Sequence, residues 1–236
     1  MIWLRSLLFN LGMWLLVIPY ALLTLLLIPM PAPRRSRIIA GWARLVVRWL
    51  SLTCGLNYRV FGAEHIPDHA CIILAKHQSA WETIAFQAIF PPQIWVLKRS
   101  LLLLPFFGWA LWALKSIAID RAAGRDALKQ LVSQGRDRLA LGLSVVVFPE
   151  GTRIAPGNTG KYHIGGAWLA THTGATVLPV AHNAGEYWRK NSLLKHPGTI
   201  TVSIGPPIRA AGMKADALNH QVASWIEAEM ARLDSL

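Results

Sequence analysis

The chain has few cysteines and few acidic residues, and both shortages narrow what it can be. Cys54 and Cys71 are its only cysteines, too few for a disulfide framework or a cysteine metal cluster, which favours a reducing compartment and two buried apolar side chains. Its 12 Asp and Glu face 24 Lys and Arg, so the formal net charge is +12. Charged residues make up 15% of the 236 and hydrophobic residues 53%, which excludes intrinsic disorder. Together with 11 Trp, this composition favours an anionic membrane over nucleic acid as the partner of the positive charge.

The shortage of acidic residues is complete in the first quarter of the chain. Residues 1–63 hold seven Arg and no Asp, Glu or Lys, so +7 of the net charge lies there. Within this quarter the run 11–28 is uncharged and apolar, and about 20 apolar residues suffice to span a bilayer. Pro19 and Pro29 interrupt the run, so a kinked span and a re-entrant helix are both open. The run is too long for a cleaved signal peptide, and no A-x-A site follows it.

A second helix is predicted directly after this run. Its apolar residues recur at spacings of four and three, while three arginines fall mostly off that stripe. The stripe consists of Ile38, Trp42, Leu45, Trp49 and Leu52, and the arginines are Arg37, Arg44 and Arg48. The pattern is typical of a helix at a bilayer surface, and the alternative is a core-facing helix of a soluble domain. We predict a membrane-anchoring helix pair over residues 1–54, with the arginine cluster on the cytoplasmic side.

From residue 55 onward, short apolar runs alternate with helical patterns. Strands are predicted at 70–75, 93–97, 116–119, 144–148, 176–180 and 199–204, and helices at 80–90, 106–114, 125–141, 164–173 and 215–233. This alternation predicts an α/β domain over residues 55–236, with a mixed central sheet and helices packed on it. Pro179 lies inside one predicted strand and indicates an edge strand or a bulge.

A strand end followed at once by a helix start carries the first candidate chemistry. His77 follows the predicted strand 70–75, and Glu82 stands about one helical turn further on. A carboxylate at this spacing can orient an imidazole that acts as a general base. The alternative is structural, because Ser79 and Glu82 also form a capping box, in which the glutamate only caps the helix.

The second candidate is the sequence F-P-E-G-T-R at 148–153, which follows a valine-rich strand. Gly151 and Arg153 offer backbone N–H groups and a guanidinium, a combination that suits a phosphate or a carboxylate. Glu150 could orient Arg153 or bind a substrate hydroxyl. An ordinary turn with solvated charges would present the same pattern.

The third candidate is the uncharged stretch 100–114, which has cations on both sides. Lys98 and Arg99 precede it, and Lys115 and Arg121 follow it. The stretch is too short to span a bilayer, but it could line an acyl-chain slot or lie among lipid headgroups, with the cations near an anionic headgroup. A buried amphipathic helix is the alternative.

Taken together, these blocks resemble the glycerolipid acyltransferase family. That family carries an H-x4-D block, a G-x-x-F-I-x-R block, an F-P-E-G-T-R block and a V-x-P-V-like block in this order. The counterparts here are residues 77–82, 117–121, 148–153 and 177–180. The resemblance runs from about residue 60 to 205, and the N-terminal helix pair also resembles the membrane anchor of the family.

The resemblance implies roles for individual residues. His77 would take the proton from the free hydroxyl of a lysophospholipid, which then attacks an acyl thioester, and Glu82 would orient His77 although the family usually has Asp there. The implied substrate-binding residues are Lys98, Arg121, Glu150, Gly151, Thr152 and Arg153. In the resemblance, Arg121 and Arg153 would hold the glycerol phosphate, and Lys98 could join them. No metal or cofactor is implied; the co-substrate is acyl-CoA or an acyl carrier protein thioester.

The sequence therefore predicts a membrane-bound O-acyltransferase of the bacterial inner membrane, with its catalytic domain facing the cytoplasm. The implied reaction converts lysophosphatidic acid, which is 1-acyl-glycerol-3-phosphate, into phosphatidic acid. Ser100, Lys115 and His163 depart from the family pattern and leave the acceptor open, so another lysolipid such as a lyso-ornithine lipid is the alternative. A non-catalytic binder of anionic membranes or nucleic acid is a more distant alternative, because it does not explain the four blocks.

Overall fold

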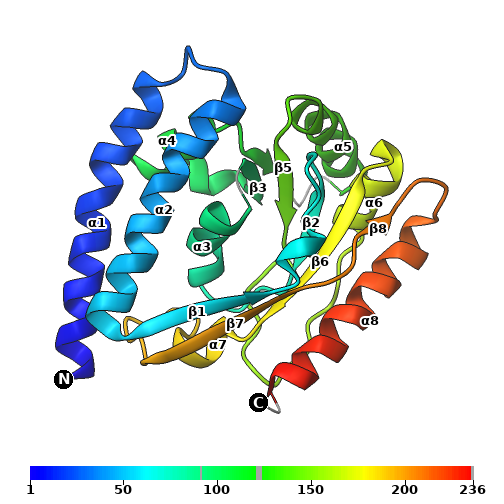
Figure 1. Cartoon of the computed structure of the whole chain (residues 1–236). Helices are drawn as coiled ribbons and strands as arrows, with labels where there is room; N and C mark the ends of the chain where they lie inside the picture. Colours follow the sequence, from blue (N-terminus) through cyan, green and yellow to red (C-terminus); the bar gives the residue numbers. More distant parts are fainter. Residues whose placement is uncertain (91, 121–123, 235–236) are drawn as a thin grey trace.

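Two long helices form a hairpin at the N-terminus (Figure 1). The structure, a computed structural model, describes residues 1–90, 92–120 and 124–234. Helix α1 (Ile2–Leu26) continues through Pro19 without a break, and α2 (Ala32–Cys54) returns beside it. By length and composition α1 could cross a membrane, with a mean hydropathy of 1.9 over its most apolar window and only 17% of that window buried. The predicted helix pair is therefore present, and its first helix leaves most of its apolar side chains uncovered.

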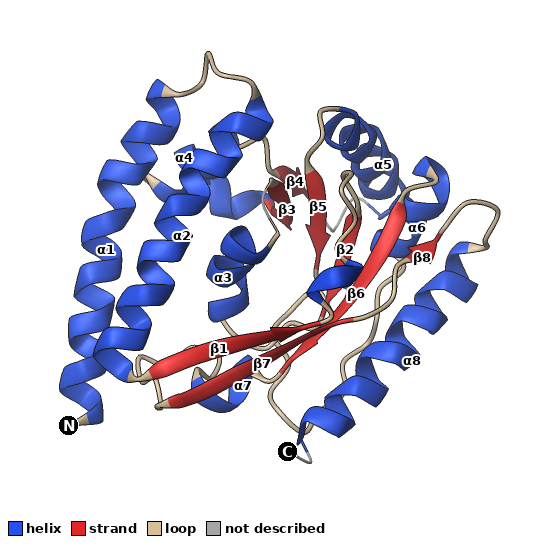
Figure 2. Cartoon of the chain, viewed as in Figure 1, coloured by secondary structure: helices blue, strands red, loops and turns tan. Residues whose placement is uncertain are grey.

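A mixed sheet forms the centre of the remaining chain (Figure 2). The strands are β1 (Leu56–Phe61), β2 (Ile72–Ala75), β3 (Gln93–Lys98), β4 (Ile117–Ile119), β5 (Ser144–Val147), β6 (Thr176–His182), β7 (Gly198–Ile204) and β8 (Ile208–Arg209). Their order in the described part of the chain is β1-β7-β6-β2-β5-β3-β4, with β8 also paired to β6. Strands β4, β3, β5, β2 and β6 run parallel to one another, whereas β7 and β8 pair antiparallel with β6, and β1 pairs parallel with β7. The predicted mixed α/β sheet is confirmed.

Helices cover both faces of this sheet (Figures 1 and 2). The helices beyond the hairpin are α3 (Trp81–Ile89), α4 (Phe107–Ala113), α5 (Gly124–Ala140), α6 (Gly165–Thr173), α7 (Ala184–Tyr187) and α8 (Ala215–Asp234), with short 3-10 helices η1 (Ala63–His65) and η2 (Arg99–Leu103). Side chains of β2 alternate between the layers: Ile73 packs with Phe86 on the α3 side, while Ile72 and Leu74 pack with the residues of α5, α6 and α8. The central strands are apolar throughout because they are buried on both faces.

Helix α2 presents different surfaces to the protein and to its surroundings. Val46 and Leu50 are buried in the core shared with α3 and the sheet, whereas Leu45 and Leu52 are exposed beside Arg48. The predicted apolar stripe is thus divided between a buried face and an exposed face. The buried face fits the interpretation as a core-facing helix, and the exposed face fits the interpretation as a helix at a bilayer surface. The helix ends at Cys54, where the predicted boundary between anchor and α/β domain lies. That these are separate domains stays a prediction.

The predicted strands and helices of the α/β part are all present, with ends shifted by at most two residues. Strands β1 and β8 were not predicted, and β1 shows why. It is an edge strand in which only Leu56 is buried and Arg59 lies in the middle, so it lacks an apolar pattern. Cys54 and Cys71 are both buried, as predicted, and burial raises the pKa of the Cys71 thiol to about 11.

Of the two alternatives predicted for Pro179, an edge strand or a bulge, the edge strand is wrong. Strand β6 lies inside the sheet, paired with β2 on one side and with β8 and then β7 on the other. Pro179 stands between the segments that pair with β8 and β7, and its carbonyl accepts the N–H of Gly205. A proline is tolerated there because its missing N–H faces the corner where the chain passes from β7 to β8.

Candidate active site

In the loop after β2, the ring of His77 and two backbone N–H groups all approach one carboxylate oxygen of Glu82. His77 Nδ1 lies 2.8 Å from Glu82 Oε1, and the backbone N–H groups of Gln78 and Ser79 donate to the same oxygen at 2.9 and 2.7 Å. Ser79 Oγ in turn accepts the N–H of Trp81 at 3.1 Å. Glu82 therefore makes both contacts that the sequence suggested, the pair with His77 and the cap of α3. The longer glutamate side chain still reaches the imidazole.

The pairing fixes which nitrogen of His77 is available to a substrate. Glu82 is fully buried; burial by itself would raise its pKa, but the hydrogen bonds from the His77 ring and from the N–H of Ser79 hold the pKa below its ordinary value. An ionised carboxylate only accepts hydrogen bonds, so Nδ1 of His77 carries the hydrogen. The lone pair of Nε2 is then left to take a proton, which is the arrangement of a general base.

A second histidine supports the pair from behind. His182, at the end of β6, is fully buried and lies 4.0 Å from Glu82 Oε2. Its Nε2–H donates to the carbonyl of Lys76 at 2.9 Å, and its Nδ1 accepts the N–H of Ala184 at 3.3 Å, so the ring is neutral. Burial lowers the pKa of His182. The sequence reasoning missed this residue, although it ends the strand next to β2 and follows the V-x-P-V-like block.

His77 lines a cavity of about 430 Å³ that combines cations with apolar side chains. Its ring stacks on Phe148, with 4.0 Å between the ring centroids. The cationic lining consists of Lys98, Arg153 and Lys190; the apolar lining includes Trp42, Ile84, Trp95, Leu97, Leu101, Phe107 and Leu111. A cavity of this size and lining suits a small amphiphile with an anionic headgroup.

Four of the predicted substrate-binding residues line the same cavity as His77. They are Lys98, Gly151, Thr152 and Arg153. Gly151 has φ of +68°, which favours glycine in the turn that closes when its N–H donates to the carbonyl of Phe148. Lys190 was not predicted; its Nζ donates to Thr152 Oγ1 at 3.3 Å and to the Arg153 carbonyl at 3.1 Å. Arg121 lies outside the described residues.

Glu150 is not among the residues that line the cavity. Its carboxylate is buried behind the loop, where Oε2 accepts the backbone N–H of His77 at 2.8 Å and Oε1 lies 2.8 Å from Nζ of Lys76. Lys76 Nζ also lies 2.8 Å from Oε1 of Glu227 on α8, and Tyr162 donates its hydroxyl to Glu227 at 2.6 Å. This ion-pair cluster, made of the buried Lys76 and Glu150 and the partly exposed Glu227, ties the His77 loop to the last helix.

The sequence and the fold match a known class of enzymes. Residues 57–183, more than half of the chain, match the family model described as Acyltransferase, and the matched segment contains His77, Glu82 and Arg153. The chain belongs to the acyltransferase family, as the sequence blocks indicated.

Particular relatives narrow the comparison. The chain is 46% identical over 210 residues to the 1-acyl-sn-glycerol-3-phosphate acyltransferase of Pseudomonas aeruginosa, which covers 86% of this chain and 82% of the relative. It is 30% identical over 192 residues to a protein of the same enzyme name from Chlamydomonas reinhardtii, covering 77% of this chain and 57% of that one. In structure it resembles the 1-acyl-sn-glycerophosphate acyltransferase PlsC of Thermotoga maritima, with a TM-score of 0.82, 21% identity and coverage of 99% and 96%. At this identity the structural likeness concerns the fold.

Proposed function

We propose that the chain transfers a fatty acyl group from an acyl thioester to the free hydroxyl of 1-acyl-glycerol-3-phosphate, giving phosphatidic acid. The observation that carries this proposal is the orientation of His77, whose Nδ1 is held by Glu82 while the ring lines a cavity with three cations and an apolar lining. The enzyme name of the Pseudomonas aeruginosa relative supports the same acceptor.

The reaction follows from the state of the dyad. Nε2 of His77 accepts the proton of the acceptor hydroxyl as its oxygen forms a bond to the thioester carbonyl carbon. The tetrahedral intermediate then collapses, the carbon–sulfur bond breaks, and the leaving thiolate takes the proton back from Nε2. During the step the imidazole is positively charged, and the buried carboxylate of Glu82 stabilises that charge.

The cations account for the choice of acceptor. Lys98, Arg153 and Lys190 line the cavity, and a phosphomonoester that carries close to two negative charges is the part of lysophosphatidic acid that they suit. Arg121, which the family resemblance assigns to the same phosphate, remains part of the proposal. The apolar lining would take the acyl chains. Binding both ends places the free hydroxyl at the imidazole and contributes to the rate by proximity.

The proposed setting is the surface of the bacterial inner membrane, with the α/β part on the cytoplasmic side. Helix α1 exposes apolar side chains such as Trp3, Trp14 and Leu15, and the exposed face of α2 carries Arg44 and Arg48. Such a pairing of apolar and basic surfaces suits an anionic bilayer. The donor is the thioester of coenzyme A or of acyl carrier protein, both available on that side.

The proposal is tested by product identification. The full-length protein in detergent micelles is given equal amounts of lysophosphatidic acid and a lyso-ornithine lipid, with acyl-CoA in one reaction and acyl-acyl carrier protein in another. We expect phosphatidic acid as the main product in at least one of them and none with His77→Ala, which controls for uncatalysed transfer. Ornithine lipid as the main product would contradict the proposed acceptor, and acylation by His77→Ala at the wild-type rate would contradict the proposed base.

A further inference from the structure

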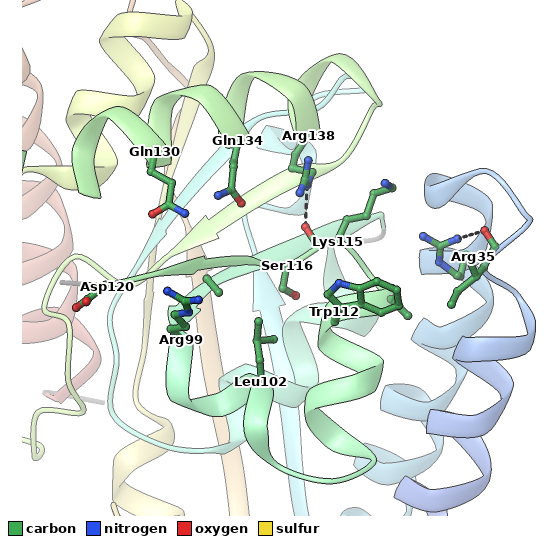
Figure 3. A pocket seen from close by; sticks show the side chains of 13 residues that line it. Arg35, Arg99, Leu102, Trp112, Lys115, Ser116, Asp120, Gln130, Gln134 and Arg138 are labelled. Atoms are coloured by element: carbon green, nitrogen blue, oxygen red, sulfur yellow. Dashed lines mark hydrogen bonds between the residues drawn. The ribbon is translucent and has the colours of Figure 1, made fainter. Parts of the chain in front are cut away.

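A second cavity, of about 500 Å³, lies on the other side of η2 and shares no lining residue with the first. Consecutive residues of one short segment divide between the two: Lys98 and Leu101 line the His77 cavity, and Arg99 and Leu102 line the second one. Figure 3 shows side chains from η2, α5, and α2 meeting around this second cavity. The candidate active site makes no use of it.

Positive charge dominates the polar lining of the second cavity. It contains Arg35, Arg99, Lys115 and Arg138, against the single carboxylate of Asp120 among the described lining residues. The four cations come from the N-terminal hairpin, the segment around α4 and helix α5, so the fold gathers charges that are far apart in the sequence (Figure 3). Guanidinium groups match the oxygen geometry of a phosphate, which makes a phosphate group the best-suited occupant.

Two buried polar atoms of this lining have no hydrogen-bond partner among the described residues. They are Nε of Arg35, a residue only 3% exposed, and Oγ of Ser116. The other end of the Arg35 guanidinium is engaged, because NH1 donates to the carbonyls of Ile28 and Met30 at 2.9 Å. Each atom has almost no exposed surface, so a ligand oxygen in the cavity reaches it only when the side chain turns toward the cavity, and the hydrogen bond then made removes the cost of a buried donor without a partner.

The surroundings of the cavity indicate where such a phosphate comes from. Its lining also includes Ile28, at the turn of the hairpin, and Trp112, whose side chain is 63% exposed. Leu103, the last residue of η2, and Leu104, which follows it, are exposed as well. A basic cavity beside exposed aliphatic and aromatic side chains fits the level at which the phosphates of a bilayer lie.

We propose that this second cavity binds the phosphate headgroup of an anionic phospholipid of the membrane. The lipid is a ligand separate from the acyl acceptor, and its acyl chains extend past Trp112 toward the apolar surface of α1. The proposal rests on the membrane setting given above, but it does not require acyl transfer. Its tests are therefore made by binding, without an acyl donor.

The sharpest test is Ser116→Ala, because this change removes an unpartnered hydroxyl and leaves the shape of the site. We measure binding of dioctanoyl phosphatidylglycerol to the full-length protein in uncharged detergent, with dioctanoyl phosphatidylcholine as the neutral lipid. Loss of one hydrogen bond should weaken phosphatidylglycerol binding by about three- to tenfold, while the melting temperature without lipid stays unchanged or rises. Ser133→Ala, on the exposed surface of α5, is the matched control and should bind as the wild type does. Equal binding by Ser116→Ala and the control would overturn the proposal.

Removing positive charge from the second cavity should weaken phosphatidylglycerol binding more than Ser116→Ala does. Arg99→Gln/Arg138→Gln removes two cations of the lining, and we expect phosphatidylglycerol affinity to fall by about tenfold or more, because hydrogen bonds to charged groups are the stronger ones. Arg125→Gln/Arg209→Gln removes the same charge from exposed positions outside the cavity and should have little effect.

Free phosphorylated molecules are the competing occupants. Inorganic phosphate and coenzyme A are each added to the wild type and to Ser116→Ala. Displacement of the Ser116-dependent lipid by micromolar coenzyme A, or a preference for inorganic phosphate over phosphatidylglycerol, would overturn the assignment to a membrane lipid. Retention of the lipid in both competitions supports it.

Discussion

Two buried carboxylates flank the loop that follows β2, and they serve it in different ways. Glu82 stands on the cavity side, where one oxygen accepts three N–H groups, including that of the His77 ring. Glu150 stands on the opposite side, where it shares the ammonium group of Lys76 with Glu227. The first carboxylate touches a ring that is open to the cavity, so its charge can act on a reaction. The second is closed off in an ion-pair cluster, so its effect is on the position of the loop.

The largest effect is expected at the group that would exchange a proton. His77→Ala should lower kcat by about 10³-fold or more, since a positioned general base contributes on that scale. The change in melting temperature should be small, because the His77 side chain is partly exposed to the cavity. His69→Ala, at a largely exposed histidine, is the control and should keep full turnover. A large loss of stability in His77→Ala would instead indicate that the His77 side chain mainly stabilises the loop, as the ion-pair cluster does.

The ion-pair cluster is tested by Lys76→Met. Removing the ammonium leaves the buried carboxylate of Glu150 without a counter-ion, next to the partly exposed carboxylate of Glu227, so the free energy of unfolding should fall by about 3–5 kcal/mol. Turnover per folded molecule should fall much less than in His77→Ala. Lys129→Met breaks an exposed ion pair with Asp126 and should change stability by about 1 kcal/mol at most.

Chemical denaturation of both lysine variants measures this difference. Lys76→Met/Glu150→Gln should recover part of the loss, because it removes one of the unpaired charges. If Lys76→Met is as stable as Lys129→Met, the ion-pair cluster does not hold the loop in place, and the structural role given to Glu150 is contradicted.

The phosphate-binding part of the site is expected to show in KM. Arg153→Gln should raise KM for lysophosphatidic acid by about 10- to 100-fold, the range for one charge-assisted hydrogen bond, with a smaller change in kcat. Steady-state kinetics over a range of acceptor concentrations separates the two constants. Arg125→Gln, on an exposed position of α5, is the charge-matched control. An unchanged KM in Arg153→Gln would remove this arginine from the acceptor site.

The smallest effect is a pH dependence of stability at His182. Burial lowers the pKa of this histidine in the folded protein, so the unfolded chain binds a proton below its ordinary value of 6.5 before the folded chain does. Stability from this group is therefore complete above about pH 6.5 and is lost as the pH falls, by at most about 1.4 kcal/mol per pH unit. His182→Gln should lose less stability than the wild type between pH 7 and 5.5 in thermal melts. Parallel curves for the two proteins would contradict the neutral state of the buried ring.

The sequence allowed one side of the loop to be predicted and not the other. His77 and Glu82 are five residues apart, so a strand end and one helical turn bring them together, and this spacing is visible in the chain. Lys76 and Glu227 are 151 residues apart and meet only because α8 packs beside β6 and the loop. No local pattern marks such a pair.

The difference between local and long-range patterns also explains why the central strands were predicted from the sequence, whereas β1, His182 and Lys190 were not. The apolar runs of the central strands predicted the sheet, because burial on both faces leaves a strong pattern. The edge strand β1 leaves none, since most of its residues, Tyr58 and Arg59 among them, are exposed whichever face of the sheet they lie on. His182 and Lys190 come from segments that the strand order places next to β2 and the 148–153 turn, and that order was not available from the sequence.

The most direct test of the account is Glu82→Gln, measured for both kcat and melting temperature. Glutamine keeps an oxygen that can accept the N–H groups of Gln78 and Ser79, so the cap of α3 is preserved, but the negative charge beside His77 is lost. If the pair works as a base, kcat falls by about 10²- to 10⁴-fold at a nearly unchanged melting temperature. Full turnover with an unchanged melting temperature would show that Glu82 only caps the helix, and it would contradict the central claim.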